Sequence, residues 1–129
     1  MALAEGDVYG VIGEDGFRRL VGAFYRRVPE DDLLGRMYPP NDLEAAEDRL
    51  VSFLIQRFGG PDAYSQARGH PRLRMRHAPF AIDWTARHRW IELMTAALDE
   101  TTLPGEVRAL LEPYFRSTAT FMINRESDE

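Results

Sequence analysis

The apolar residues of this chain recur at the spacing of α-helices. In the first such segment they fall three, four, seven and eleven positions apart and share one helix face, and they are Phe17, Leu20, Val21, Phe24 and Val28. Later segments, over about residues 43–54, 84–98 and 107–121, repeat the pattern. No segment alternates apolar and polar residues as a half-buried strand does. The chain is therefore predicted to be all-α.

Several residues mark where these helices should begin and end. Asp15 and Asp83 precede two of the apolar stripes and are expected to cap the helices that follow. Gly59 and Gly60 should end the second helix. A short turn around Val8 to Ile12 is expected ahead of the first long helix.

Length and charge limit the classes of protein to consider. The 129 residues are predicted to form one domain (1–129), with a short N-terminal segment (1–12) and a frayed tail (125–129). A net charge of −5 argues against binding to nucleic acid or to anionic membranes. No apolar run is long enough to span a membrane. The chain has no cysteine, and its N-terminus lacks the pattern of a signal peptide, so a cytoplasmic location is expected.

Residues 59–82 interrupt the helical pattern with a segment rich in Gly, Pro and Arg. Within it, the stretch Arg68 to Phe80 holds four arginines and two histidines, although the chain as a whole is acidic. A compact domain seldom carries so long a connection unless the connection is functional. We therefore look for a site here.

His77 is the candidate ligand in this stretch. Pro79 restricts the residue before it to extended geometry, so a short helix that begins near Leu73 should end at His77. Apolar neighbours disfavour the imidazolium and leave a neutral ligand for a transition metal. No second histidine follows one turn later, so a porphyrin is a suitable source of the other ligands, and arginines would pair with its propionates. Taken alone, however, His77 also fits a structural residue at a helix end, and the arginines a solvated face.

A resemblance favours the first interpretation. The segments 24–28, 37–50, 58–80 and 89–94, which include "FGGPDAYSQARGHPRLRMRHAPF", resemble the group II truncated haemoglobins. This resemblance implies a two-over-two α-helical sandwich around haem b, with the proximal helix reduced to a turn inside a long loop. It also implies that His77 is the axial ligand of the iron.

The same resemblance implies roles on the ligand side of the haem. Tyr25, Tyr38 and Trp90 match its hydrogen-bond donors, which would stabilise a polarised diatomic ligand. Ala46 stands where many globins place a distal histidine, so no imidazole would close the site. Leu50 should cap the pocket.

Other positions should hold the haem itself. Contacts with the ring are expected from Phe53, Leu73, Phe80 and Met94. Arg49, Arg74, Arg76 and Tyr64 are candidates for the propionates. Each of these residues also fits ordinary core packing or a solvated surface.

The function implied by the resemblance is reversible and tight binding of O2 for transport or storage, with CO and NO as alternative ligands. Nitric oxide dioxygenase or peroxidase reactivity would need an external reductase, and no residue is assigned as catalytic. The sequence leaves a homodimer open. The alternative is a haem-free helical domain that binds an acidic partner through the arginine-rich loop, and an intense Soret band would distinguish the two.

Overall fold

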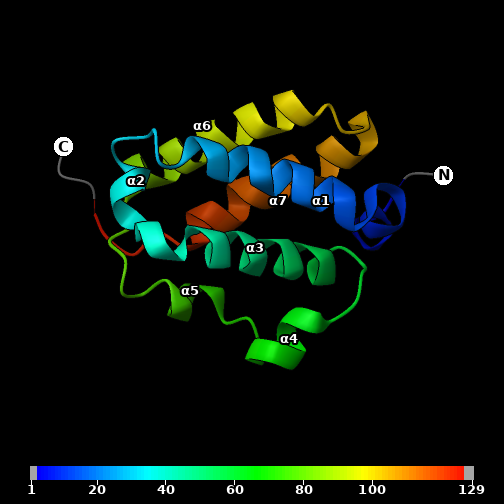
Figure 1. Cartoon of the computed structure of the whole chain (residues 1–129), viewed down its shortest axis with the longest axis horizontal. Helices are drawn as coiled ribbons and strands as arrows, with labels where there is room; N and C mark the ends of the chain where they lie inside the picture. The colour runs from blue at the N-terminus through cyan, green and yellow to red at the C-terminus, as the bar shows by residue number, and fades with distance from the viewer. Residues whose placement is uncertain (1–2, 127–129) are drawn as a thin grey trace.

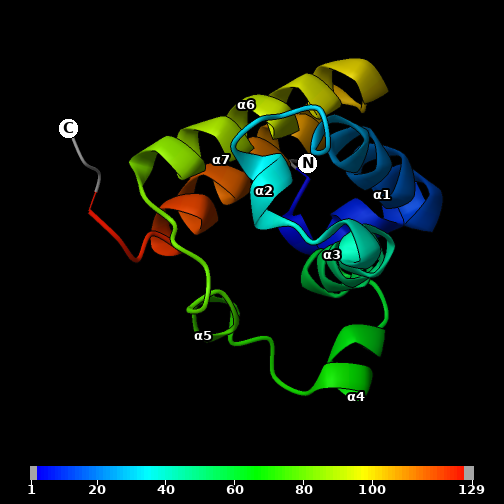
Figure 2. The ribbon, with the colours of Figure 1, turned by 60° about the vertical axis from the view of Figure 1, so that its left-hand side comes forward.

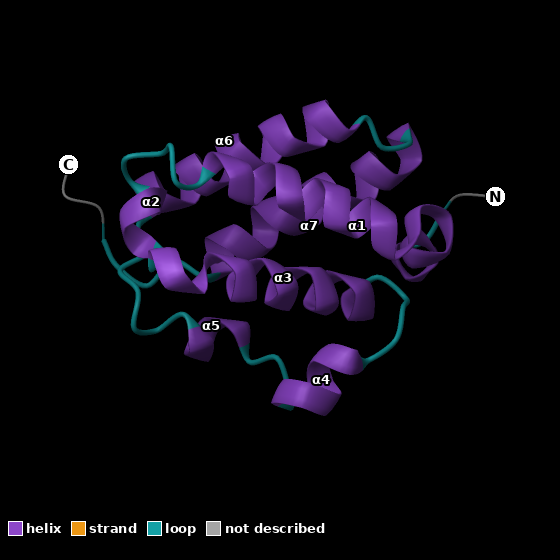
Figure 3. Ribbon diagram, in the orientation of Figure 1, coloured by secondary structure: helices purple, strands orange, loops and turns teal. Residues whose placement is uncertain are grey.

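A computed structural model describes residues 3–126, and the regular elements in this part of the chain are helices, with no strand (Figures 1 and 3). The α-helices are α1 (Val8–Arg27), α2 (Leu34–Met37), α3 (Leu43–Arg57), α4 (Ala63–Arg68), α5 (Leu73–Arg76), α6 (Trp84–Thr101) and α7 (Gly105–Phe121). Short 3-10 turns precede α1 (Glu5–Asp7) and α3 (Pro40–Asp42).

The long helices form two layers. Helix α1 packs against α3 and against α6, and α6 packs against α7. Figure 2 shows α1 beside α3 on one side of the molecule and α6 with α7 on the other, while α4 and α5 lie outside both layers. The predicted two-over-two helical sandwich is confirmed.

The first apolar stripe lies at the centre of the core. Phe17, Leu20, Val21, Phe24 and Val28 are all fully buried, as their helical spacing predicts. The start of this helix differs from expectation. Helix α1 already begins at Val8 and continues through a break at Gly13, whose φ of 64° is unusual for any other residue. Asp15 therefore lies inside α1, where it pairs with Arg19, and does not cap the helix.

Helix α3 ends where the glycines predict. Gly59 follows its last turn with a φ of +101°, and a Cβ placed there would lie 1.9 Å from the carbonyl oxygen of Gly6. The neighbouring Phe58 carbonyl accepts a hydrogen bond of 3.0 Å from the N–H of Tyr9. The end of α3 and the start of α1 thus touch backbone to backbone, which only glycine permits at position 59.

We expect Gly59→Ala to lower the free energy of unfolding by about 3 kcal/mol, because alanine would bring both backbone strain and a clash with Gly6. Urea unfolding would measure the loss. Gly10→Ala is the matched control. Gly10 lies in the first turns of α1 with no atom near its would-be Cβ, so alanine there should leave stability unchanged or raise it by up to about 1 kcal/mol. Equal midpoints for the two variants would contradict the close approach at Gly59.

The segment 59–82 contains only two short helices. Helix α4 has 6 residues, of which Tyr64 is buried, and α5 has 4 residues, of which none is buried. Arg72 precedes α5 in the left-handed conformation with a φ of 45°, and His77 ends α5 as its C-cap residue. The predicted helix end at His77 is confirmed, and little of this segment is held by a core of its own.

The last two helices also follow their sequence signals. The Asp83 carboxylate accepts a hydrogen bond of 2.9 Å from the N–H of Ala86, so it caps α6 as predicted. Pro104 stands immediately before α7. At the C-terminal end of α7 the prediction was wrong by one position. The apolar stripe was expected to end at residue 121, but Phe121 is 62% exposed and Met122 is buried. Met122 follows Thr118 by four positions, so it continues the buried face of the helix.

The chain after α7 returns to the α5–α6 connection. The backbone N–H groups of Asn124 and Arg125 both donate to the carbonyl of Ile82, at 2.8 and 3.0 Å. The expected frayed tail begins at Arg125, and residues 127–129 of it lie outside the described residues. Among the residues that are described, no helix combines the length and the apolar character needed to cross a membrane.

Candidate functional site

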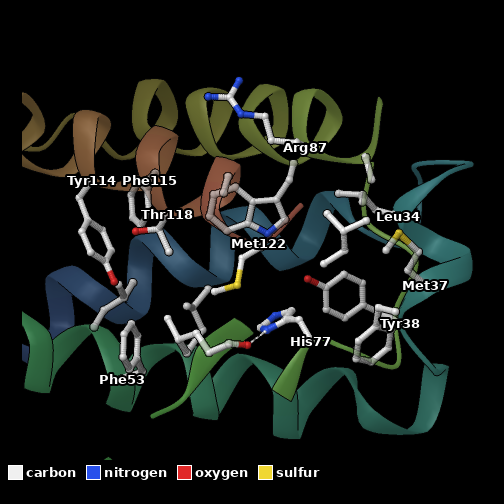
Figure 4. Close-up of a pocket in the computed structure, with 18 residues that line it drawn as sticks. Leu34, Met37, Tyr38, Phe53, His77, Arg87, Tyr114, Phe115, Thr118 and Met122 are labelled. Atoms are coloured by element: carbon white, nitrogen blue, oxygen red, sulfur yellow. Dashed lines mark hydrogen bonds between the residues drawn. The ribbon is translucent and has the colours of Figure 1, made fainter. Parts of the chain in front are cut away.

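A largely apolar cavity lies between the two layers and is closed on one side by the segment 73–82 (Figure 4). Side chains from α2, α3, α6, α7 and this segment line it. They are Leu34, Met37, Tyr38, Leu50, Phe53, Leu54, Leu73, His77, Phe80, Ile82, Ala86, Arg87, Trp90, Tyr114, Phe115, Thr118, Ala119 and Met122.

His77 presents its imidazole to this cavity in a fixed orientation. Its Nδ1 lies 2.7 Å from the carbonyl oxygen of Leu73, one turn earlier in the chain. A carbonyl can only accept a hydrogen bond, so Nδ1 is the donor in this contact, and Nε2 is the nitrogen left to bind a metal. Figure 4 draws this contact as a dashed line on the side of the cavity that the segment 73–82 forms. The ring is therefore oriented by a carbonyl of its own short helix.

Three aromatic residues with polar groups, Tyr25, Tyr38 and Trp90, form a cluster at this cavity, and Tyr38 and Trp90 line it together with His77. The rings of Tyr25 and Tyr38 meet edge to face with centroids 5.6 Å apart, and the Tyr38 hydroxyl points into the cavity (Figure 4). Trp90 packs against Phe24 at 5.1 Å and against Phe115 at 5.7 Å. These contacts come from α1, α6 and α7, so the arrangement depends on the packing of distant segments.

The hydroxyls of Tyr25 and Tyr38 stay protonated in this environment. Burial raises the pKa of Tyr25, and the neighbouring Tyr38 raises it further. Burial also raises the pKa of Tyr38, and hydrogen bonds with Tyr25 and Trp90 oppose the rise without cancelling it. Since Trp90 can only donate, the Tyr38 oxygen accepts from its indole N–H. The cluster therefore offers neutral donors beside an apolar space.

A partly buried ion pair lies beside this cluster. Asp31, before α2, accepts hydrogen bonds from the backbone N–H groups of Leu33 and Leu34 and pairs with Arg89 at 2.6 Å. Burial alone would raise the pKa of the Asp31 carboxyl, yet these donors hold its pKa below the ordinary value. Arg89 immediately precedes Trp90, so the pair fixes the segment leading to Tyr38 against α6.

The residues predicted for the site fall into two groups. Seven of them line the cavity, namely Tyr38, Leu50, Phe53, Leu73, His77, Phe80 and Trp90. The others lie outside its lining, namely Tyr25, Ala46, Arg49, Tyr64, Arg74, Arg76 and Met94. Of these, Tyr25 lies behind Tyr38, and Tyr64 packs against Phe53 with ring centroids 5.5 Å apart.

The predicted arginines have partners within the chain. Arg49 pairs with Asp42 at 2.8 Å. Arg76 donates to the backbone carbonyls of Pro71 and Arg68, both at 2.7 Å. Arg74 donates to the carbonyls of Phe121 and Ile123, at 3.1 and 3.3 Å. The guanidinium groups of Arg74 and Arg76 thus stabilise loop backbone, and neither is neutralised by a carboxylate within the described residues.

Helix α7 contributes lining residues that sequence reasoning did not assign to the site. Tyr114, Phe115 and Thr118 belong to its predicted apolar stripe, and Ala119 and Met122 complete the same face. The helical periodicity indicated that this side of α7 is buried. It did not indicate that this side lines the cavity. Met37 and Ile82 were also missed, because no local pattern marks them. Arg87 lies three positions after Trp84 and three before Trp90 on the predicted helix, but it was not assigned to the site.

Comparison with known proteins identifies the family. The family model described as bacterial-like globin matches residues 7–124. The chain belongs to this globin family. It is 38% identical over 121 residues to "Group 2 truncated hemoglobin YjbI" of Bacillus subtilis, covering 94% of this chain and 91% of that protein. The predicted resemblance to group II truncated haemoglobins is confirmed.

Solved structures agree with this assignment. The haemoglobin of the thermophilic phototrophic bacterium Chloroflexus aurantiacus superposes on this globin with a TM-score of 0.88 at 50% identity, covering 92% of this chain and 98% of that one. A structure described as truncated oxygen-avid haemoglobin from Bacillus subtilis gives a TM-score of 0.86 at 38% identity, covering 91% and 98%. A haem-free interaction domain is therefore not favoured.

The globin family implies a haem cofactor, and the cavity suits one. It offers apolar walls and one imidazole whose Nδ1 is engaged by the Leu73 carbonyl, which leaves Nε2 to bind the iron. Within residues 3–126, no group of three or more His, Asp or Glu side chains could hold a metal ion unaided. A metal at His77 would need its remaining ligands from another molecule, and a porphyrin supplies four nitrogens in one plane.

Proposed function

We propose that this globin binds O2 reversibly and tightly at the iron of haem b, with His77 as the axial ligand. The observation that carries the proposal is one cavity that contains both an imidazole oriented through Nδ1 and the polar groups of Tyr38 and Trp90. When bound, the haem supplies an iron with one position open to a diatomic gas. The sequence contains no cysteine, so attachment through thioether bonds is not available.

The apolar lining would hold the porphyrin. Leu73 and Phe80 flank His77 on one side of the cavity, and Leu50 and Phe53 of α3 border it on another. Met94 and Ala46 are buried outside the lining, where they would support these walls. Arg49, Arg74, Arg76 and Tyr64 are the residues that we assign to the propionates, and the arginines would exchange some of their present partners for them.

Tyr38 and Trp90 are the donors proposed to stabilise the gas ligand, because both reach the cavity. Tyr25 would act from behind by fixing the Tyr38 hydroxyl. Neutral donors in an apolar space stabilise a polarised ligand without bringing in water. The relative described as oxygen-avid supports tight binding of O2 here. Tight binding favours retention of oxygen over bulk delivery.

CO and NO are expected to occupy the same position as O2. Nitric oxide oxidation or peroxide reduction would need electrons from a separate reductase, because the sequence lacks the glycine-rich fingerprint of a nucleotide-binding domain. These reactions are secondary to oxygen binding in the proposal.

Reconstitution of the apoprotein with haemin tests the proposed function. We expect one haem per chain, an intense Soret band, and a ferrous spectrum that shifts with O2 and returns when the gas is removed. CO should compete with O2 for the same position. A reduced protein whose spectrum does not respond to either gas would show that a side chain closes the site, and a colourless product would reject the haem assignment.

A further inference from the structure

The chain after α7 meets the turn that carries His77. Asn124 lies three positions beyond the end of α7, and its side chain reaches the segment 77–82. We propose that Asn124 is a positioning residue that fixes the backbone of His77 and thereby the direction of its imidazole. The inference rests on the proposed role of His77 as the axial ligand.

The Asn124 carboxamide uses both of its ends on this segment. Its Nδ2 donates to the carbonyl of Phe80 at 2.9 Å and to the carbonyl of His77 at 3.3 Å. Its Oδ1 accepts from the N–H of Ile82 at 2.9 Å. The backbone N–H of Asn124 adds a bond of 2.8 Å to the Ile82 carbonyl. One side chain therefore contacts the turn at three points, including His77 itself.

The turn that carries His77 needs contacts from outside because it buries few side chains of its own. Helix α5 has 4 residues and none is buried, and a helix this short is unstable in isolation. Phe80 is 39% exposed. Burial therefore contributes little to the position of His77, and hydrogen bonds from outside the turn must supply what the local sequence does not.

A second contact joins the same two segments. Arg74 of α5 donates to the carbonyls of Phe121 and Ile123, which flank the buried Met122. Met122 packs in a small cluster with Ile82 and Ala86 at the start of α6. The C-terminal segment 121–125 is thus anchored at Met122, and Asn124 extends from that anchor to His77.

The two constraints on His77 act on different parts of the residue. The Leu73 carbonyl orients the imidazole ring through Nδ1, and the Asn124 amide restrains the backbone carbonyl of His77. Removing the amide should leave the ring contact in place and let the backbone move. The imidazole would then approach the iron from a wider range of angles.

The test compares the holoproteins of Asn124→Leu and Asn124→Asp with wild type and with Arg125→Ala. The aspartate has nearly the shape of asparagine and keeps an acceptor for Ile82, but it turns an oxygen toward the carbonyls of His77 and Phe80. Arg125 is the control because its side chain donates only to the Asn124 carbonyl among the described contacts. The readouts are the ferrous iron–histidine stretching band by resonance Raman and the rate of haem transfer to excess apomyoglobin.

We expect the band to broaden or shift in both Asn124 variants and haem transfer to accelerate roughly tenfold, while Arg125→Ala matches wild type. Lower thermal stability with an unchanged band and transfer rate would overturn the proposal, because it would show a merely structural role. If wild type lacks the band, or His77→Gly retains it, the proposed function fails and this inference fails with it. The two failures are therefore distinguishable.

Discussion

Replacing His77 with glycine will remove the iron–histidine band and weaken haem retention on the order of a hundredfold, which corresponds to about 3 kcal/mol of binding free energy. The reason is structural as well as chemical. His77 is the lone histidine in the lining of the cavity, and the described residues offer no cluster that could hold the metal instead. Haem titration monitored at the Soret band measures the loss. Free imidazole should restore the band, because glycine leaves room for it.

The other two histidines provide matched controls for this experiment. His70 and His88 are both exposed, and His88 packs beside Trp84 at the surface with ring centroids 5.7 Å apart. His70→Ala and His88→Ala should retain haem as wild type does. Equal losses in all three variants would mean that the effect is general destabilisation and that His77 is not the axial ligand.

Removing the Tyr38 hydroxyl is expected to accelerate release of O2 roughly tenfold, since a hydrogen bond in a dry site contributes about 1 kcal/mol or more to ligand retention. The hydroxyl of Tyr38 points into the cavity (Figure 4). It also forms hydrogen bonds with Tyr25 and Trp90. Tyr38→Phe keeps the ring that packs against Tyr25 and removes only the oxygen. Stopped-flow displacement of O2 by CO from the ferrous protein measures the release rate.

The position of each aromatic residue predicts how strongly its substitution will accelerate the release of O2. Trp90→Phe should also accelerate release strongly, because the indole lines the cavity. Tyr25→Phe should have a smaller effect, because its hydroxyl acts through Tyr38 from outside the lining. Tyr9→Phe is the control, since Tyr9 packs against the core away from the cavity. A larger effect from Tyr25→Phe than from Tyr38→Phe would contradict the proposed arrangement of donors.

Local sequence signals were sufficient for the long helices and for placing His77 at a helix end, but not for the start of α1 or for the short helices α2 and α4. The stripe from Phe17 to Val28 is fully buried, Asp83 caps α6, and Pro79 marks the helix end at His77. Each signal depends on residues within a few positions of one another, where backbone geometry alone relates the pattern to the structure. The resemblance to group II truncated haemoglobins then supplied the family, and the comparisons confirmed it.

The number of arginines in the sequence did not predict which groups their side chains would bind. The arginine-rich stretch suggested anion binding, but Arg74 and Arg76 donate to backbone carbonyls of the loop and of the chain after α7. A guanidinium can satisfy either kind of acceptor, so composition cannot choose between them. The choice depends on which carbonyls the fold brings within reach.

By itself the sequence determined the long helices and their buried faces, because these follow from spacing along one segment, whereas the assignment of His77 as the iron ligand rests on the family resemblance. Only the tertiary structure decided that Met122 joins the cavity wall, that Tyr38 lies between Tyr25 and Trp90, and that Asn124 supports His77 from 47 positions away. Such contacts join segments that are far apart along the chain, and no spacing pattern in the sequence marks them. These contacts depend on how the buried faces of the helices pack together, and no single segment of the sequence determines that packing.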